Sequence, residues 1–313
     1  MTESNPIEIV SLRKEYRDFV AVDDLSLSIQ RNSFTGLLGP NGAGKSTTLK
    51  ILTHLINPTS GHAYLNGIDV SEDPKKALTG VGTVIETPEF YGYLTPRETF
   101  AYIGGILGMS GETVSSETDR ILELVKMTDW ADKKLGTFSK GMRQRIALGQ
   151  ALLDDPRVII LDEPTSGLDP RGMAEMREIL KNLRNDTSDL TIVMSSHILH
   201  EVEDLCDRVA MINHGKLLIH DDISAVTAIA GVETMVLRVE GTPDEDMVAK
   251  VSSIPCVVSA ERSGNEIMIG FDTSQRKRSE LFSDISALGI GAYALAEGDS
   301  LESRYLDLIK ESR

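Results

Sequence analysis

Cysteine, aromatic residues and long apolar runs are all scarce in this sequence. Its 313 residues include two cysteines, one tryptophan and 5% aromatic residues in total. The two cysteines, Cys206 and Cys256, lie in separate parts of the chain, so we expect free thiols in a reducing compartment and no disulfide framework. No apolar run approaches the ~20 residues that a membrane-spanning helix needs, and residues 1–6 are polar, so we expect no secretory signal. A role at a membrane would therefore require a partner protein.

Positive charge is also in deficit. The chain has 32 lysines and arginines against 48 aspartates and glutamates, which gives a net charge of −16. Nucleic-acid-binding proteins usually carry a basic stripe, so we do not expect nucleic acid as a partner. The hydrophobic content of 41% is ordinary for a globular protein with a core, and the length suggests about two domains.

One glycine-rich segment stands between an apolar run at residues 34–38 and a helical run at residues 47–55. Strand, glycine loop and helix in this order, with the spacing Gly-x-x-x-x-Gly-Lys-Ser, match a P-loop. Glycines let backbone N–H groups close on phosphate oxygens, and the helix start adds a positive end. Lys45 is placed to reach the β- and γ-phosphates, and Ser46 to hold Mg²⁺. The predicted phosphate-binding residues are Gly39, Pro40, Asn41, Gly42, Ala43, Gly44, Lys45, Ser46 and Thr47.

Two carboxylates follow another apolar run. Residues 158–161 are typical of a fully buried parallel strand, and Asp162 and Glu163 come directly after them. Asp162 is placed to hold the Mg²⁺ of a P-loop site. Glu163 is suited to polarise a water molecule.

Two more strand ends carry polar residues. Glu86 ends a buried strand expected at residues 81–85, at the edge where ligands collect in open α/β sheets. His197 follows a strand expected at residues 190–194 and is placed to bind a γ-phosphate or orient the attacking water. Taken alone, a histidine at this place is more often structural.

The segment before the P-loop is expected to form strands. Residues 8–12 alternate apolar and polar side chains as an edge strand does, and residues 20–22 and 25–29 continue as strands. Tyr16 lies between these runs. An aromatic ring ahead of a P-loop either stacks on a nucleotide base or packs against protein, and the sequence leaves both open.

Helical periodicity dominates from about residue 94 to residue 154. Residues 113–127 are amphipathic, and Ser139 is placed to cap a further helix that ends near residue 153. A capped helix start followed by basic residues is a second anion-binding feature, although a weak one.

The chain changes character from about residue 225. Its strands and helices are expected in the order β-α-β-β-α-β, which is the ferredoxin-like order, and a last helix is expected at residues 301–310. This part has no glycine loop, metal cluster or nucleophile constellation.

In their order along the chain, these motifs resemble the nucleotide-binding subunit of an ABC transporter. The match covers roughly residues 6–225 and includes residues 138–142 and 166–169 beside the motifs above. Residues 85–91 are similar to those of lantibiotic-immunity and bacitracin-type exporters, and the tail looks like the small C-terminal domain of many drug- and antibiotic-export subunits.

The resemblance implies an α/β fold. The expected P-loop ATPase core at residues 6–225 has a mainly parallel sheet, an antiparallel β subdomain and a helical subdomain at about residues 87–155. A small α+β domain of the ferredoxin-like class is expected at residues 226–313.

The resemblance also implies a role for each motif. Tyr16 stacks on adenine, Glu163 is the general base and His197 is the switch histidine. Asp169 belongs to the D-loop, and Glu86 takes the place of the Q-loop glutamine. The expected Mg²⁺ site comprises Ser46, Glu86 and Asp162, and the signature segment comprises Phe138, Ser139, Lys140, Gly141 and Met142.

Several positions depart from the family pattern. Glu86 replaces glutamine, while Lys140 and Met142 replace the glycine and glutamine of the Leu-Ser-Gly-Gly-Gln signature. The sequence leaves open whether Lys140 contacts phosphate or points to solvent.

The function implied is ATP hydrolysis with Mg²⁺ that powers transport, with export as the expected direction. One chain carries one P-loop and one signature segment, so a homodimer with two sandwiched ATP molecules is expected. The other expected partner is a separate multi-span permease, which places the chain at the cytoplasmic face of the membrane. Two alternatives stay open, an ABC ATPase that acts on a soluble partner without a permease, and a P-loop kinase.

Overall fold

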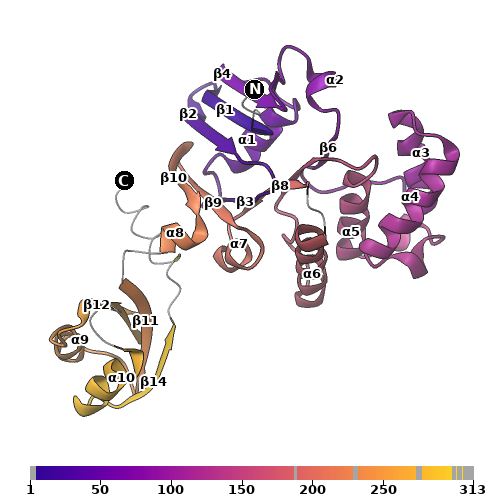
Figure 1. Ribbon diagram of the computed structural model, residues 1–313. Coiled ribbons are helices and arrows are strands. Elements are labelled where there is room, and N and C mark those ends of the chain that lie inside the picture. Colours follow the sequence, from indigo (N-terminus) through magenta and orange to yellow (C-terminus); the bar gives the residue numbers. More distant parts are fainter. Residues whose placement is uncertain are drawn as a thin grey trace. The chain divides into compact units, whose positions relative to one another are not determined.

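The computed structural model describes residues 5–186, 189–227, 232–272, 277–297, 301 and 305. Its contacts divide the chain into two compact units, Met1–Asp221 and Asp222–Arg313 (Figure 1). The assignment of residues 6–225 and 226–313 as functional domains stays a prediction. The last helix expected, residues 301–310, lies outside the described residues except at positions 301 and 305.

A six-stranded sheet forms the centre of the first unit. Its strands are β3 (Phe34–Leu38), β6 (Val81–Val84), β7 (Val158–Asp162), β8 (Thr191–Ser196), β9 (Arg208–Asn213) and β10 (Lys216–Asp222). They lie in the order β10-β9-β3-β8-β7-β6, and the pairs from β9 through β3, β8 and β7 to β6 are parallel. Every residue of β3, β7 and β8 is buried. This burial explains why these strands are unbroken apolar runs in the sequence.

An antiparallel sheet forms a second layer of this unit. Its strands are β1 (Ile7–Tyr16), β2 (Phe19–Ile29), β4 (Ser60–Leu65) and β5 (Ile68–Asp69), in the order β2-β1-β4-β5. The prediction of an edge strand at residues 8–12 is wrong, because β1 pairs with β2 on one side and β4 on the other. The alternation arises because only one face of an antiparallel sheet needs to be buried, which also holds for inner strands.

Helices α1 (Lys45–Leu52), α2 (Pro74–Ala77), α6 (Pro170–Asp186) and α7 (Leu199–Leu205) connect these strands. Side chains of both sheets and of α1 share one hydrophobic core, which includes Leu37, Leu49 and Ile160. The glycine loop is thus anchored at both ends, by β3 before it and by α1 after it.

Three helices form a separate lobe of the first unit, at the right of Figure 1. They are α3 (Pro96–Leu107), α4 (Gly111–Leu124) and α5 (Lys140–Ala151). Ser139 caps α5, as predicted, because its Oγ accepts a bond from the backbone N–H of Met142. Helix α4 ends earlier than predicted, since Lys126 has a positive φ of 57° that a helix cannot continue through.

The second unit is built around its own four-stranded antiparallel sheet. Its elements are α8 (Ile223–Thr227), β11 (Val232–Val239), α9 (Glu245–Ser252), β12 (Val257–Ser263), β13 (Glu266–Asp272), α10 (Arg278–Ala287) and β14 (Ala292–Glu297). The strand order is β12-β13-β11-β14. A separate core includes Leu237, Ile269 and Phe271. From β11 onward the described elements follow β-α-β-β-α-β; the ferredoxin-like assignment stays a prediction.

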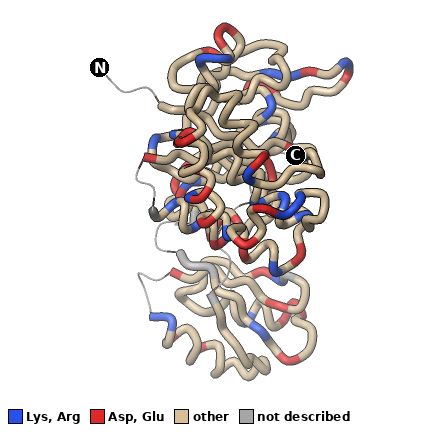
Figure 2. Tube along the Cα trace, turned by 90° about the vertical axis from the view of Figure 1, so that its right-hand side faces the viewer, with Lys and Arg blue, Asp and Glu red and all other residues tan. Residues whose placement is uncertain are grey.

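Two properties of the described residues bear on the partners of the chain. No helix among the described residues combines the length and the apolar character needed to cross a bilayer. Acidic and basic residues are interspersed along the trace in Figure 2 and do not separate by sign.

Candidate active site

The register of the parallel strands brings the predicted site residues to one edge of the central sheet. Leu38 at the end of β3 pairs with Ser196 at the end of β8, and Asp162 at the end of β7 pairs with Ser195. The segments that follow these strands therefore lie side by side, at the carboxyl edge where α/β sheets bind ligands.

The glycine loop closes tightly on its surroundings. Gly44 caps α1 with a φ of 103°, a conformation that favours glycine. A Cβ on Gly44 would lie 2.4 Å from the carbonyl oxygen of Ala21, and one on Gly39 would lie 2.2 Å from that of Ile212. Larger residues would push the loop out of place, so both glycines are required for its shape.

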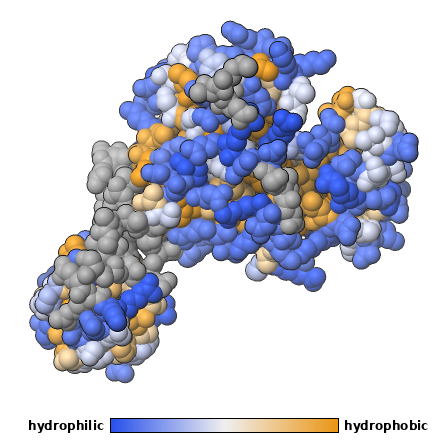
Figure 3. All heavy atoms as spheres, viewed as in Figure 1, coloured by the Kyte–Doolittle hydropathy of each residue, from blue (hydrophilic) through white to orange (hydrophobic). Residues whose placement is uncertain are grey.

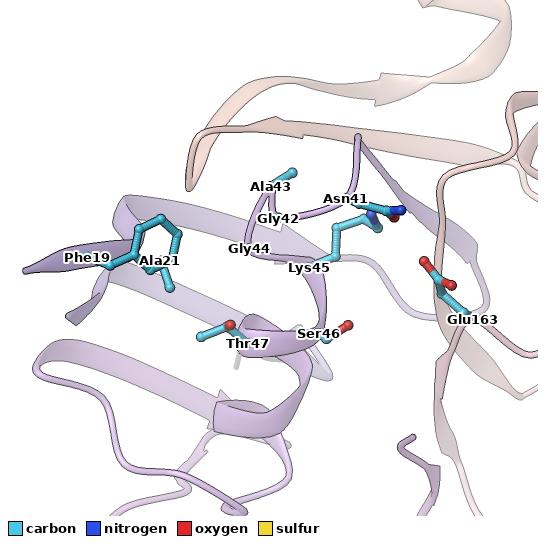
Figure 4. A pocket seen from close by; sticks show the side chains of 10 residues that line it. All are labelled: Phe19, Ala21, Asn41, Gly42, Ala43, Gly44, Lys45, Ser46, Thr47 and Glu163. Atoms are coloured by element: carbon cyan, nitrogen blue, oxygen red, sulfur yellow. The ribbon is translucent and has the colours of Figure 1, made fainter. Parts of the chain in front are cut away.

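A pocket of about 150 Å³ opens over this loop. Figure 4 shows Glu163 on one side of the pocket, facing Lys45 and Ser46, and Phe19 at the other end. The lining residues are Phe19, Ala21, Asn41, Gly42, Ala43, Gly44, Lys45, Ser46, Thr47 and Glu163. The first backbone N–H groups of a helix lack partners within the helix, and together with the adjacent buried lysine they make this pocket suitable for phosphate groups.

Lys45 is folded back into the loop. Its Nζ donates to the carbonyl oxygens of Gly39 at 2.7 Å and Pro40 at 3.1 Å. Burial lowers the pKa of Lys45 below its ordinary value, and the nearby Glu163 and Asp162 carboxylates oppose this shift. A phosphate group entering the pocket would replace the two carbonyl oxygens as a stronger, charged acceptor.

Ser46 and Asp162 are in direct contact. The Ser46 hydroxyl donates to Oδ1 of Asp162 at 3.0 Å, and the Ser195 hydroxyl donates to the same oxygen at 2.6 Å. Asp162 is buried, so these bonds fix its carboxylate. A hydroxyl and a carboxylate oxygen beside a phosphate pocket are the hard oxygen donors that Mg²⁺ prefers, so this pair fits the predicted metal.

Glu163 is held from two directions. Its backbone N–H donates to Oγ of Ser195 at 2.9 Å, and its Oε1 lies 2.9 Å from Nδ1 of His197. Its φ of 44° is unusual for a residue other than glycine. The carboxylate is thereby turned toward the phosphate pocket with a histidine beside it, an arrangement that suits a general base.

Glu86 also faces this region but has a different partner. A cavity of about 760 Å³ has both Glu86 and the Ser46–Asp162 pair in its lining. The Glu86 carboxylate, however, forms an ion pair with Lys50 of α1. In this arrangement Lys50 holds the carboxylate that we predicted as a third Mg²⁺ ligand.

The segment 138–142 lies at the start of α5. Gly141 approaches α6, and a Cβ on it would come within 3.8 Å of the Gly172 Cα. Asp169 accepts a bond from the backbone N–H of Gly172 at 3.0 Å and so caps α6. The ten residues that line the P-loop pocket come from other segments. Within one chain, therefore, residues 138, 139, 141 and 142 line neither this pocket nor the cavity of about 760 Å³, whereas Lys140 lines that cavity together with Ser46 and Asp162.

Tyr16 is another predicted residue that lies outside the pocket lining. It pairs with Phe19 across the turn between β1 and β2, and Phe19 lines the pocket instead. The Nζ of Lys14 lies 4.9 Å from the centre of the Tyr16 ring. Sequence reasoning missed Phe19, although its place three residues after Tyr16 puts both rings at one hairpin end.

Comparison with known proteins gives consistent matches. The family model described as "ABC transporter" matches residues 22–166. The chain is 40% identical over 215 residues to the bacitracin transport ATP-binding protein BcrA of Bacillus licheniformis, an alignment that covers 69% of each chain. It is 30% identical over 306 residues to the linearmycin resistance ATP-binding protein LnrL of Bacillus subtilis (strain 168), covering 96% of this chain and 97% of LnrL.

Solved structures agree with these matches. One described as an ATP-binding subunit of an ABC transporter is 26% identical, with a TM-score of 0.64 over 71% of this chain and 92% of that chain. A second is a dimeric, post-hydrolysis state of the ATP-binding cassette MJ0796 with ADP and Pi. It is 25% identical, with a TM-score of 0.61 over 69% of this chain and 98% of that chain.

Proposed function

This chain belongs to the ATP-binding subunits of ABC transporters and hydrolyses ATP, and we propose that it powers an exporter through a separate transmembrane partner. The observation that carries the ATP-driven part of this proposal is the joint placement of the glycine loop, the Ser46–Asp162 pair and Glu163 at one sheet edge.

ATP would bind with its phosphates in the glycine loop. Lys45 would exchange the carbonyl oxygens of Gly39 and Pro40 for phosphate oxygens. Ser46 and Asp162 would hold Mg²⁺, and the bound ion would neutralise part of the charge on the phosphates. The adenine ring would lie toward the hairpin end that carries Tyr16 and Phe19, where an aromatic face is available for stacking.

Glu163 would act as the general base. Its carboxylate would accept a proton from the attacking water, and the neighbouring His197 would orient the carboxylate and the γ-phosphate. The 2.9 Å contact between the two side chains supports this division of roles.

A second copy of the chain would complete each site. Residues 138–142 lie outside the P-loop pocket of their own chain, so Ser139 and Gly141 are proposed to contact the nucleotide held by the partner. A two-fold dimer then has two equivalent composite sites. The dimeric ATP-binding cassette among the structural neighbours is consistent with this proposal.

The permease is proposed to contact the lobe formed by α3 and α4. Tyr102, Ile106 and Leu107 of α3 are 57%, 68% and 50% exposed. A groove of about 380 Å³ beside them includes Ala101 and Val114 in its lining. Figure 3 shows hydrophobic residues on the surface of this lobe. Exposed apolar residues that cluster in this way mark an interaction surface. We propose that this surface faces the membrane partner from the cytoplasm.

Export is the proposed direction because the resemblance extends to proteins named for antibiotic transport and resistance, BcrA and LnrL. If a tagged chain recovered from detergent-solubilised membranes brings no multi-span protein with it, the alternative of a soluble partner is favoured instead.

The proposal is tested by Glu163→Gln. We expect phosphate release to fall at least ~100-fold, because amide nitrogen and oxygen cannot accept the proton, while ATP binding is kept. In gel filtration with ATP and Mg²⁺ this variant should elute as a dimer. The matched control is Glu178→Gln on the exposed face of α6, which should behave as wild type. Normal turnover in the Glu163 variant would refute the role of Glu163 as general base. A monomer with ATP bound would refute the proposal that two subunits share each nucleotide site.

A further inference from the structure

Lys140 occupies a position where a cation is not expected. It is the first residue of α5, and the free N–H groups at a helix start give that end a partial positive charge. A lysine there is unfavourable unless a nearby acceptor offsets the repulsion. A residue that breaks a local rule in this way is a candidate for a functional role.

The acceptor is a backbone carbonyl of a different segment. The Nζ of Lys140 donates to the carbonyl oxygen of Ser166 at 2.8 Å. The next residue, Gly167, has a φ of 67°, and a Cβ on it would lie 2.4 Å from this Nζ. The loop therefore has both an acceptor and the space that the ammonium group needs.

Ser166 belongs to the turn that begins at Glu163. Its backbone N–H donates to the carbonyl oxygen of Glu163 at 3.0 Å. Glu163 has a left-handed backbone conformation, and such a conformation persists only where its surroundings enforce it. Ser195 holds Glu163 on one side, and the turn fixed by Lys140 holds it on the other.

The electrostatic surroundings favour a cation at this point. Lys140 lines the same cavity of about 760 Å³ as Glu86, Asp162 and Glu163. These carboxylates therefore favour the positive charge of Lys140, while the ammonium group donates its hydrogen bond to the carbonyl oxygen of Ser166.

We propose that Lys140 is a positioning residue that acts within its own subunit. Its ammonium group fixes the carbonyl of Ser166, and through the 163–166 turn it holds the Glu163 carboxylate in place. Lys140 thus serves the turnover of the ATP bound to its own chain, although it stands in the segment proposed to contact the partner's ATP. This inference rests on the proposed role of Glu163 as general base.

The test uses the full chain with Lys140→Met, Lys140→Arg and, as a matched control, Lys133→Met at an exposed position of the same subdomain. We expect kcat of Lys140→Met to fall about ten-fold with KM for ATP unchanged. Lys140→Arg keeps a charged donor and should recover kcat to within about three-fold of wild type. Hydrogen exchange of the Ser166 amide in the nucleotide-free protein should become about ten-fold faster in Lys140→Met, and Lys133→Met should change none of these values.

A phosphate-binding role for Lys140 would give a different result. In the Glu163→Gln background, Lys140→Met should leave ATP-dependent dimerisation intact; its loss, or a raised KM with unchanged kcat, would overturn the inference. Unchanged kcat and unchanged exchange would also overturn it. These results are separate from failure of the proposed function, which is read from Glu163→Gln alone.

Discussion

At the scale of single residues, the site is defined by side chains that hold one another in place. Asp162 accepts bonds from Ser46 and Ser195, and Glu163 contacts His197. These bonds orient the two carboxylates, and such preorganisation favours electrostatic stabilisation of a transition state.

Lys45 gives a prediction on pH. Burial lowers the pKa of Lys45, and bound phosphates would raise it again. ATP affinity should therefore be full below the pKa of the free site and fall as pH rises through it, starting at a lower pH than for an exposed lysine. The affinity can be followed by calorimetry between about pH 7 and 10. Lys50→Gln should keep this dependence, whereas Lys45→Ala should lose binding at least ~100-fold. A flat profile in the wild-type protein would contradict the prediction.

At the scale of helices and strands, the lobe of α3 and α4 gives a prediction on docking. Ile106→Glu places a charge in the exposed apolar surface of α3, so it should abolish co-purification with the permease. It should leave the ATPase activity of the isolated chain within about two-fold, because surface substitutions rarely disturb the fold.

The control for this experiment is Leu55→Glu, at an exposed position outside the lobe. It should retain the permease. Equal recovery of the permease with both variants would show that the docking surface lies elsewhere.

Much of the arrangement of strands and site residues was predictable from the sequence, as particular strands illustrate. Strands β3, β7 and β8 are buried on both faces, so their apolar runs identify them, and the site residues follow directly at their ends. The contacts of Lys50 with Glu86 and of Lys140 with Ser166 were not predictable. They join residues 36 and 26 positions apart, and no local pattern indicates which long side chain reaches which partner. The same limit explains why Phe19 was missed.

At the scale of the whole molecule, each unit has its own core, so damage to one core should not disable the other unit. Phe271 is fully buried in the second unit, and Phe271→Ala should destabilise that unit by about 3–5 kcal/mol. In calorimetry, the unfolding transition of the second unit should occur at a lower temperature than in the wild-type protein, while ATP affinity stays unchanged.

Phe282→Ala, at a partly exposed position of α10, is the matched control and should shift this transition far less. A parallel loss of ATP affinity in Phe271→Ala would mean that the first unit depends on the second for its fold.

The bonds from Lys45 to Gly39 and Pro40 have one more consequence. The two carbonyl oxygens are neutral acceptors, so Lys45 keeps its positive charge while they hold its ammonium group inside the loop. A triphosphate can replace both acceptors with several charged oxygens at once. We therefore expect the loop to bind polyphosphates in preference to singly charged anions.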